Sequence, residues 1–182
     1  MSNDILRRYA SLDGATGRTI HGVAIPYGEV AEVRDGYGPP YKEKFLPGAF
    51  TRSIQERGRK VRLMAMHNTR SFPIGLPVTL ADTPEGLAVA FRISDTVAGN
   101  DALALVRDGT VTGFSVGFVP IRSRTVDGVV ERLEASLREV SLVTEPAYEG
   151  AQVAGIRSKQ QVPRIVTADH ARRVMAFLDL LP

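Results

Sequence analysis

A two-residue period of apolar side chains runs from Thr110 to Arg122, where Phe114, Val116 and Phe118 alternate with Ser115 and Gly117. Such a period places successive side chains on opposite faces of an extended strand. Asp127-Gly128 is a strong hairpin turn signal and joins this strand to a second one at Val129–Leu133. Ser136–Val143 is a further extended run. The chain is therefore predicted to be built around antiparallel strands.

The rest of the chain supports a strand-rich fold. Its 17 glycines and 11 prolines are scattered as turn residues, which favours many short strands over a helical bundle. Further strands are predicted at residues 17–27, 61–66, 73–80 and 86–93, with residues 82–86 as the turn between the last two. Short helices are predicted at 49–57, ending at Gly58, and at 100–107, capped by Asn100 or Asp101. Residues 29–42 are interpreted as a loop.

The length of 182 residues corresponds to about one domain. Residues 155–166 are polar and contain Pro163, so they are interpreted as a linker. Beyond it, apolar residues recur with the spacing of an amphipathic helix, at Ala171, Val174, Met175, Leu178 and Leu181. We therefore expect a catalytic domain over residues 1–155 and a linker with a C-terminal helix over 156–182, which would be a self-cleaved or docking tail.

Composition excludes several classes of chemistry. The sequence has no cysteine, which rules out disulfides, thiolate nucleophiles and cysteine-based metal sites, and no cofactor or metal is expected. The N-terminus lacks the apolar stretch of a signal peptide, and no run approaches the roughly 18 apolar residues of a membrane span, so a soluble cytoplasmic protein without membrane contact is expected.

The formal net charge is only +3. A basic cluster is formed by Arg52, Arg57, Arg59, Lys60 and Arg62. No interleaved aromatic residues accompany it, so we interpret it as a solvated face around a helix end and expect no nucleic-acid binding.

Ser115 lies in Gly113-Phe114-Ser115-Val116-Gly117, which matches the G-x-S-x-G pattern of the nucleophile elbow in α/β-hydrolases. An elbow needs a strand before the serine and a helix after it, whereas here the alternation continues into Pro120. The hydrolase order also requires a histidine well after the serine, and only His170 follows. A small esterase is thereby disfavoured, and as a bare motif Ser115 would be an ordinary strand residue.

His67 is the best candidate for a general base. A serine hydroxyl needs a base to accept its proton, and imidazole, with an ordinary pKa of about 6.5, suits that task, so activity would rise through roughly pH 6 to 7. His67 lies at a predicted strand end before a polar turn, whereas His21 lies within a strand. A third residue must orient the imidazole, and Glu139 is the leading candidate, with Asp95, Asp101 and Glu145 as rivals.

Seven stretches occur together in an order that resembles one family. They are 22–28 (GVAIPYG), 45–50 (FLPGAF), 66–68 (MHN), 73–75 (PIG), 85–87 (EGL), 113–118 (GFSVGF) and 139–147 (EVSLVTEPA). Together they are similar to the prohead (capsid-maturation) serine proteases of tailed bacteriophages, which are related in fold to the herpesvirus maturation proteases.

The resemblance implies a mainly β fold with helices (α+β), a β-barrel of about seven strands surrounded by a few helices. It implies His67 and Ser115 as catalytic residues on barrel strands and Glu139 as the match for the third one. The implied role is to cut the scaffolding segment from the major capsid protein, and to cut itself, inside the immature capsid (prohead) in the host cytoplasm. A homo-oligomer is left open.

The competing hypothesis is a catalytically silent scaffold or capsid-assembly protein of the same fold. The presence of both His67 and Ser115 argues against it, because an inactive scaffold would need to keep neither residue.

Overall fold

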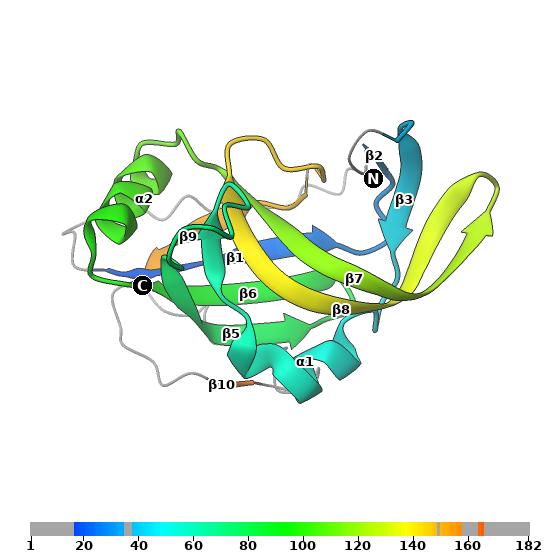
Figure 1. The fold of residues 1–182 in the computed structure, drawn as a ribbon, viewed down its shortest axis with the longest axis horizontal. Coiled ribbons are helices and arrows are strands. Elements are labelled where there is room, and N and C mark those ends of the chain that lie inside the picture. The colour runs from blue at the N-terminus through cyan, green and yellow to red at the C-terminus, as the bar shows by residue number, and fades with distance from the viewer. Residues whose placement is uncertain (1–16, 35–37, 149, 158–163, 166–182) are drawn as a thin grey trace, which may run out of the picture.

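The structure, a computed structural model, describes residues 17–34, 38–148, 150–157 and 164–165. These residues form a ten-stranded mixed sheet with two short α-helices and one 3-10 turn (Figure 1). In chain order the elements are β1 (Thr19–Pro26), β2 (Ala31–Val33), β3 (Tyr41–Phe45), α1 (Thr51–Arg57), η1 (Gly58–Lys60), β4 (Leu63–Ala65), β5 (Gly75–Asp82), β6 (Gly86–Ile93), α2 (Val97–Arg107), β7 (Gly113–Val126), β8 (Val129–Val143), β9 (Val153–Arg157) and β10 (Arg164–Ile165).

The strands follow the order β2-β3-β8-β4-β5-β6-β1-β9, with β7 paired to β8 and β10 to β5. The β5–β6 and β7–β8 hairpins are antiparallel, while β3 and β4 each run parallel to β8. Strand β8 therefore pairs with three other strands along its length. This arrangement brings β4, which ends just before His67, alongside the strand that carries Glu139.

The sheet is open, so the expected closed barrel of about seven strands is wrong for the described residues. It does curl, because an isolated bridge between Gly113 and Gln152 ties the start of β7 to the chain ahead of β9. Strands β2 and β9 nevertheless end the strand order without pairing to each other. Closure depends on such long-range pairing, which local alternation and turn residues do not specify.

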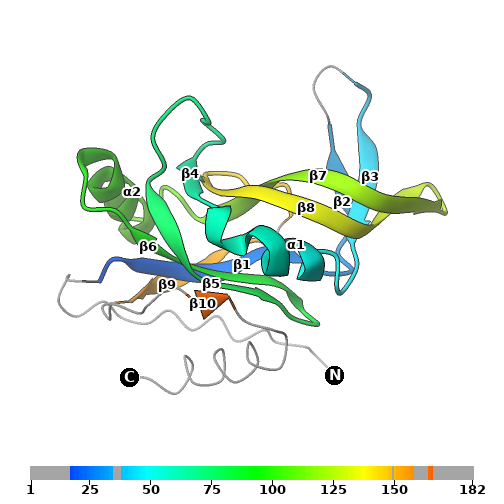
Figure 2. The same cartoon turned by 60° about the horizontal axis from the view of Figure 1, so that its bottom comes forward.

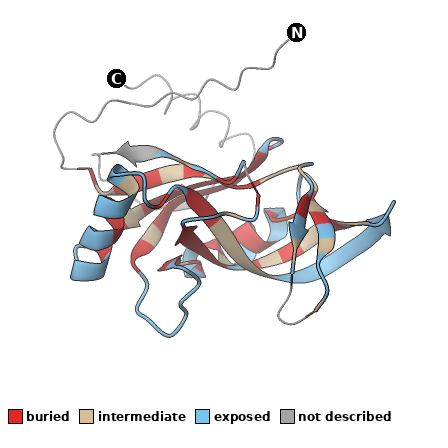
Figure 3. Cartoon of the chain, turned by 90° about the horizontal axis from the view of Figure 1, so that it is seen from above, coloured by how far each residue is buried: buried red, intermediate tan, exposed pale blue. Residues whose placement is uncertain are grey.

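The β7–β8 hairpin is the longest element and has two different ends. Asp127 and Gly128 both have positive φ, of 51° and 76°, as the two central residues of a tight hairpin turn require. The turn end projects beyond the body of the sheet and is exposed, whereas the other end is buried (Figures 1 and 3). Ser115 and Glu139 lie toward the buried end of the hairpin.

Aromatic packing and one buried carboxylate fix the core around this end. Phe45 stacks on Phe50 at a ring-centroid distance of 5.2 Å and meets the edge of Phe118 at 5.0 Å. Asp82 is buried at the end of β5 and accepts hydrogen bonds from the Phe50 N–H and the Thr51 hydroxyl, which satisfies the start of α1. Helix α1 then packs on β8 and β5 (Figure 2).

Several expected elements are confirmed and others need correction. Strand β1, the β5–β6 hairpin and helix α1 lie close to the bounds predicted from the sequence. The two predicted runs 129–133 and 136–143 form a single strand, β8. The expected loop at 29–42 contains β2 and the start of β3. The expected linker at 155–166 contains most of β9 and all of β10. The predicted C-terminal helix lies outside the described residues.

Helix α2 begins at Val97, earlier than predicted, with Thr96 as its N-cap. The Thr96 hydroxyl accepts a hydrogen bond of 3.1 Å from the Gly99 N–H. A Cβ on Gly99 would lie 2.1 Å from the Ser94 carbonyl oxygen, so close packing requires glycine in this first turn. No helix in the described part of the chain combines the length and apolar character that crossing a membrane requires.

Candidate active site

Ser115 lies on β7 directly opposite Ser141 on β8. Gly113 and Gly117 are on the same face of β7 as Ser115, because side chains alternate along a strand. Gly117 lies opposite Glu139. Directly opposed residues of an antiparallel pair have Cα atoms about 4.5–5.5 Å apart. One face of the hairpin thus gathers Ser115, Ser141 and Glu139 within a single patch.

The two glycines that flank Ser115 make room for neighbouring side chains. A Cβ on Gly117 would lie 2.5 Å from Glu139 Oε1, and a Cβ on Gly113 would lie 2.7 Å from the Pro146 ring. Strand β7 also continues to Val126 with no helix after the serine. The G-x-S-x-G pattern here is therefore a packing requirement of a continuous strand, and the rejection of a nucleophile elbow is confirmed.

His67 reaches this face through a turn at the end of β4. Ala65 pairs with Leu142, the Met66 N–H donates to the Leu142 carbonyl at 2.9 Å, and the chain then turns sharply. Met66 and His67 have φ values of 50° and 54°, in the left-handed region that a side chain such as methionine rarely adopts. The His67 N–H donates to the Ser141 Oγ at 3.1 Å, which holds the turn against β8.

The imidazole of His67 is hydrogen-bonded to the carboxylate of Glu139. His67 Nδ1 lies 2.6 Å from Glu139 Oε1, and the side chains are 44% and 12% exposed respectively. Because a carboxylate accepts, Nδ1 carries the proton and the other ring nitrogen, Nε2, is left to accept one in the neutral imidazole. This hydrogen bond raises the pKa of His67, with partial burial acting in the opposite direction.

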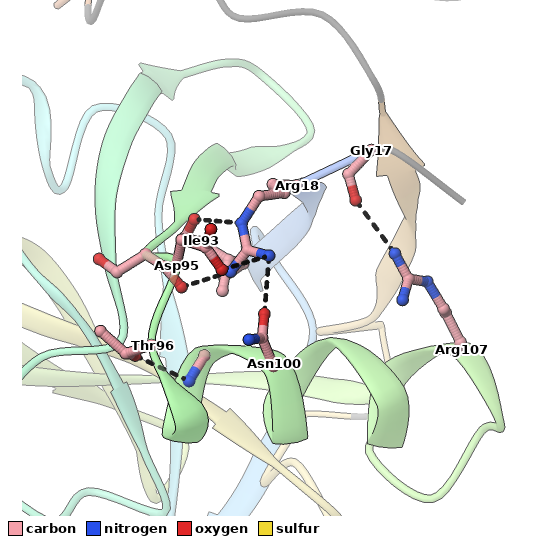
Figure 4. A network of polar contacts seen from close by, with 9 residues as sticks. Gly17, Arg18, Ile93, Asp95, Thr96, Asn100 and Arg107 are labelled. Atoms are coloured by element: carbon pink, nitrogen blue, oxygen red, sulfur yellow. Dashed lines mark hydrogen bonds and ion pairs between the residues drawn. The ribbon is translucent and has the colours of Figure 1, made fainter. Parts of the chain in front are cut away.

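None of the three rival acids forms an ion pair with His67 in the part of the chain that the structure describes. Figure 4 shows Asp95 beside Arg18, whose guanidinium is 3.3 Å from the carboxylate and also donates to Asn100 on α2. Asp95 is 81% exposed and belongs to this contact between the residue before β1 and the start of α2. Asp101 and Glu145 are exposed as well. Of the four acids considered, Glu139 is the one that the structure brings to His67.

His67 and Ser115 line the same pocket, whose volume is about 260 Å³. Most of its lining residues are apolar and include Ile25, Phe45 and Phe118, from β1, β3 and β7. One wall carries Glu43, whose carboxylate is buried, ion-paired with Arg132 at 2.8 Å and hydrogen-bonded by the Tyr148 hydroxyl at 3.1 Å. The pocket can hold an apolar side chain next to the serine hydroxyl.

The structure brings together Ser115, His67 and Glu139, the three residues that sequence reasoning singled out, whereas that reasoning gave Ser141 no role. Ser141 is completely buried, and its hydroxyl donates to Glu139 Oε2 at 2.6 Å. The sequence did contain a signal for Ser141, because residues two positions apart lie on the same face of a strand and Ser141 follows Glu139 by two positions. The two-residue period of strand β8 could therefore have pointed to Ser141.

Comparison with known proteins defines the class of the chain. Residues 6–164 match the family described as Caudovirus prohead serine protease. The chain belongs to this family and is a peptidase of the prohead type. It is 32% identical over 154 residues to the prohead protease of Enterobacteria phage HK97, an alignment that covers 82% of this chain and 67% of that protein.

Proposed function

We propose that this chain is a serine endopeptidase in which Ser115 is the nucleophile and His67 is the general base. Glu139 orients the imidazole and stabilises its protonated form. The observation that carries the proposal is the 2.6 Å hydrogen bond from His67 Nδ1 to Glu139 Oε1, on the face of the sheet that also holds Ser115. That bond leaves Nε2 as the acceptor for the serine proton.

The reaction follows from these roles. As the Ser115 Oγ attacks the carbonyl carbon of the peptide, its proton passes to His67 Nε2, and the C–N bond then breaks as the imidazolium returns that proton to the leaving amine. A water molecule, activated by the same imidazole, hydrolyses the acyl-enzyme and restores Ser115. Glu139 stabilises the imidazolium in both halves, which requires its carboxylate to stay ionised beside Nδ1.

The substrate is an extended peptide segment with one side chain in the pocket beside Ser115. The apolar residues that line the pocket, among them Ile25, Phe45 and Phe118, favour an apolar side chain, or the apolar stem of a longer one, at this position. Within the prohead, inside the host cell, the substrates are the scaffolding segment of the major capsid protein and the enzyme's own chain. Residues 1–155 act as the catalytic domain and residues 156–182 as a removable tail.

Co-expression with the major capsid protein, followed by mass determination of all fragments, tests the proposal. The expected result is a capsid protein shortened at its N-terminus with the wild-type chain and left intact with Ser115→Ala. An intact capsid protein with the wild-type chain would favour the silent scaffold instead. Equal shortening by Ser115→Ala would remove Ser115 from the role of nucleophile.

A further inference from the structure

The Ser141 hydroxyl joins two parts of the candidate site that are far apart in the sequence. It donates a hydrogen bond of 2.6 Å to Glu139 Oε2 and accepts one of 3.1 Å from the His67 backbone N–H. The side chain has no exposed surface, so water does not compete for either bond. One buried hydroxyl therefore contacts both the acid and the main chain of the histidine.

These two bonds restrict both partners of the His67–Glu139 pair. Glu139 uses Oε1 for the imidazole and Oε2 for Ser141, so its carboxylate cannot rotate without breaking one of the two bonds. The backbone of His67 lies at φ 54°, which is held only where the surroundings fix it. The bond from its N–H to Ser141 is such a restraint.

We propose that Ser141 is a positioning residue for the reaction: it fixes the Glu139 carboxylate and the His67 backbone so that the imidazole is held in one tautomer and one orientation. This inference rests on the proposed function, because it assigns Ser141 to the same site. Ser141 does not touch the substrate and acts only through its two partners.

A purely structural role for a buried serine has a matched example on the helix that packs against the same sheet. Ser53 on α1 is also buried, and its hydroxyl accepts a hydrogen bond of 2.8 Å from the N–H of Leu137 on β8. Ser53→Ala and Ser141→Ala each remove one buried hydroxyl that accepts a hydrogen bond from a backbone N–H. They differ in that only Ser141 contacts the His67–Glu139 pair.

The experiment compares kcat, KM and the NMR signal of the His67 Nδ1 proton in Ser141→Ala, Ser53→Ala and the wild-type chain. The signal is assigned by its absence from His67→Ala. In Ser141→Ala we expect kcat to fall by roughly tenfold to a hundredfold with little change in KM, since small misplacements of catalytic groups cost about that much. The slowly exchanging Nδ1 proton signal should be lost. Ser53→Ala should retain the signal and lie within about twofold of the wild-type kcat.

If Ser141→Ala does not fold, Ser141→Cys is used, because it keeps the size of the side chain and replaces a strong donor by a weak one. The same direction of change is expected. An unchanged kcat and an unchanged Nδ1 signal in either folded variant would overturn the proposal, as would equal losses in Ser53→Ala. The NMR signal reports on the His67–Glu139 bond without any turnover, so failure of the proposed peptidase reaction is distinguishable from failure of this inference.

Discussion

Gly117 lies opposite Glu139 in the β7–β8 ladder, and a Cβ on Gly117 would lie 2.5 Å from Glu139 Oε1. That oxygen is the one that holds His67. The absence of a side chain at Gly117 is therefore a condition for the His67–Glu139 hydrogen bond.

Gly117→Ala should lower kcat by roughly tenfold to a hundredfold, because the added methyl group displaces the carboxylate from His67. The test is a double-mutant cycle with Glu139→Ala, a variant that has no carboxylate to displace. If the glycine acts through Glu139, adding Gly117→Ala to Glu139→Ala costs little more. Additive losses in the double variant would show that Gly117 serves another purpose.

Glu139→Gln should keep the fold and lower the cleavage rate by between roughly tenfold and ten-thousandfold, less than Ser115→Ala. Glutamine preserves size and hydrogen bonding but removes the charge that stabilises the imidazolium. The measurement is single-turnover cleavage, with Asp95→Asn and Glu145→Gln as controls at exposed acids. Unchanged turnover in Glu139→Gln, together with a collapse in either control, would move the third role to that acid.

In the pH profile of kcat/KM, the midpoint of the acid limb should lie above pH 6.5. The Glu139 hydrogen bond raises the pKa of His67 from its ordinary value of 6.5, and the base must be neutral to accept the serine proton, so activity is lost as the pH falls through the raised pKa. In Glu139→Gln the limb should move to lower pH.

Tyr148 also lines the pocket but does not account for such a limb, because burial and the nearby Glu43 raise the pKa of its phenol, which stays neutral over the range tested. A wild-type limb at or below pH 6.5, or the same limb in Glu139→Gln, would contradict the account.

Self-cleavage is expected between Arg157 and Arg164. The polar, proline-bearing sequence predicts cleavage within the wider segment 155–168, but β9 extends to Arg157 and β10 begins at Arg164, and residues paired in a sheet do not readily enter a protease groove. Intact-mass analysis of the wild-type chain and of Ser115→Ala measures this. Only the 182-residue species in active particles, or identical cleavage in Ser115→Ala, would refute it.

Local signals predicted the hairpins well, because turn chemistry and period-two alternation are properties of neighbouring residues. Asp127-Gly128 and the residues around Pro84 marked both hairpins. Strand β3 was missed because Tyr41–Phe45 is rich in charge, and its stability comes from parallel pairing with β8. There Lys44 pairs with Glu131 at 3.0 Å, a tertiary contact that local composition does not reveal.

The candidate site was predictable from the sequence to the same extent as the fold. The choice of Glu139 over Asp95 could be made from resemblance, but the geometry that supports it depends on β4 running parallel to β8, a pairing between segments far apart in the chain. The contribution of Ser141 depends on that pairing as well, because the bond from the His67 N–H forms only when the two strands lie together.

The most direct test of the central claim is covalent labelling of the purified protein with a fluorophosphonate, followed by peptide mapping by mass spectrometry. An activated serine reacts with this class of probe, whereas an ordinary strand serine does not. The account predicts one adduct, on the peptide that contains Ser115, which is absent from Ser115→Ala and strongly reduced in His67→Ala. No adduct, or an adduct on a different residue that persists in Ser115→Ala, would contradict it.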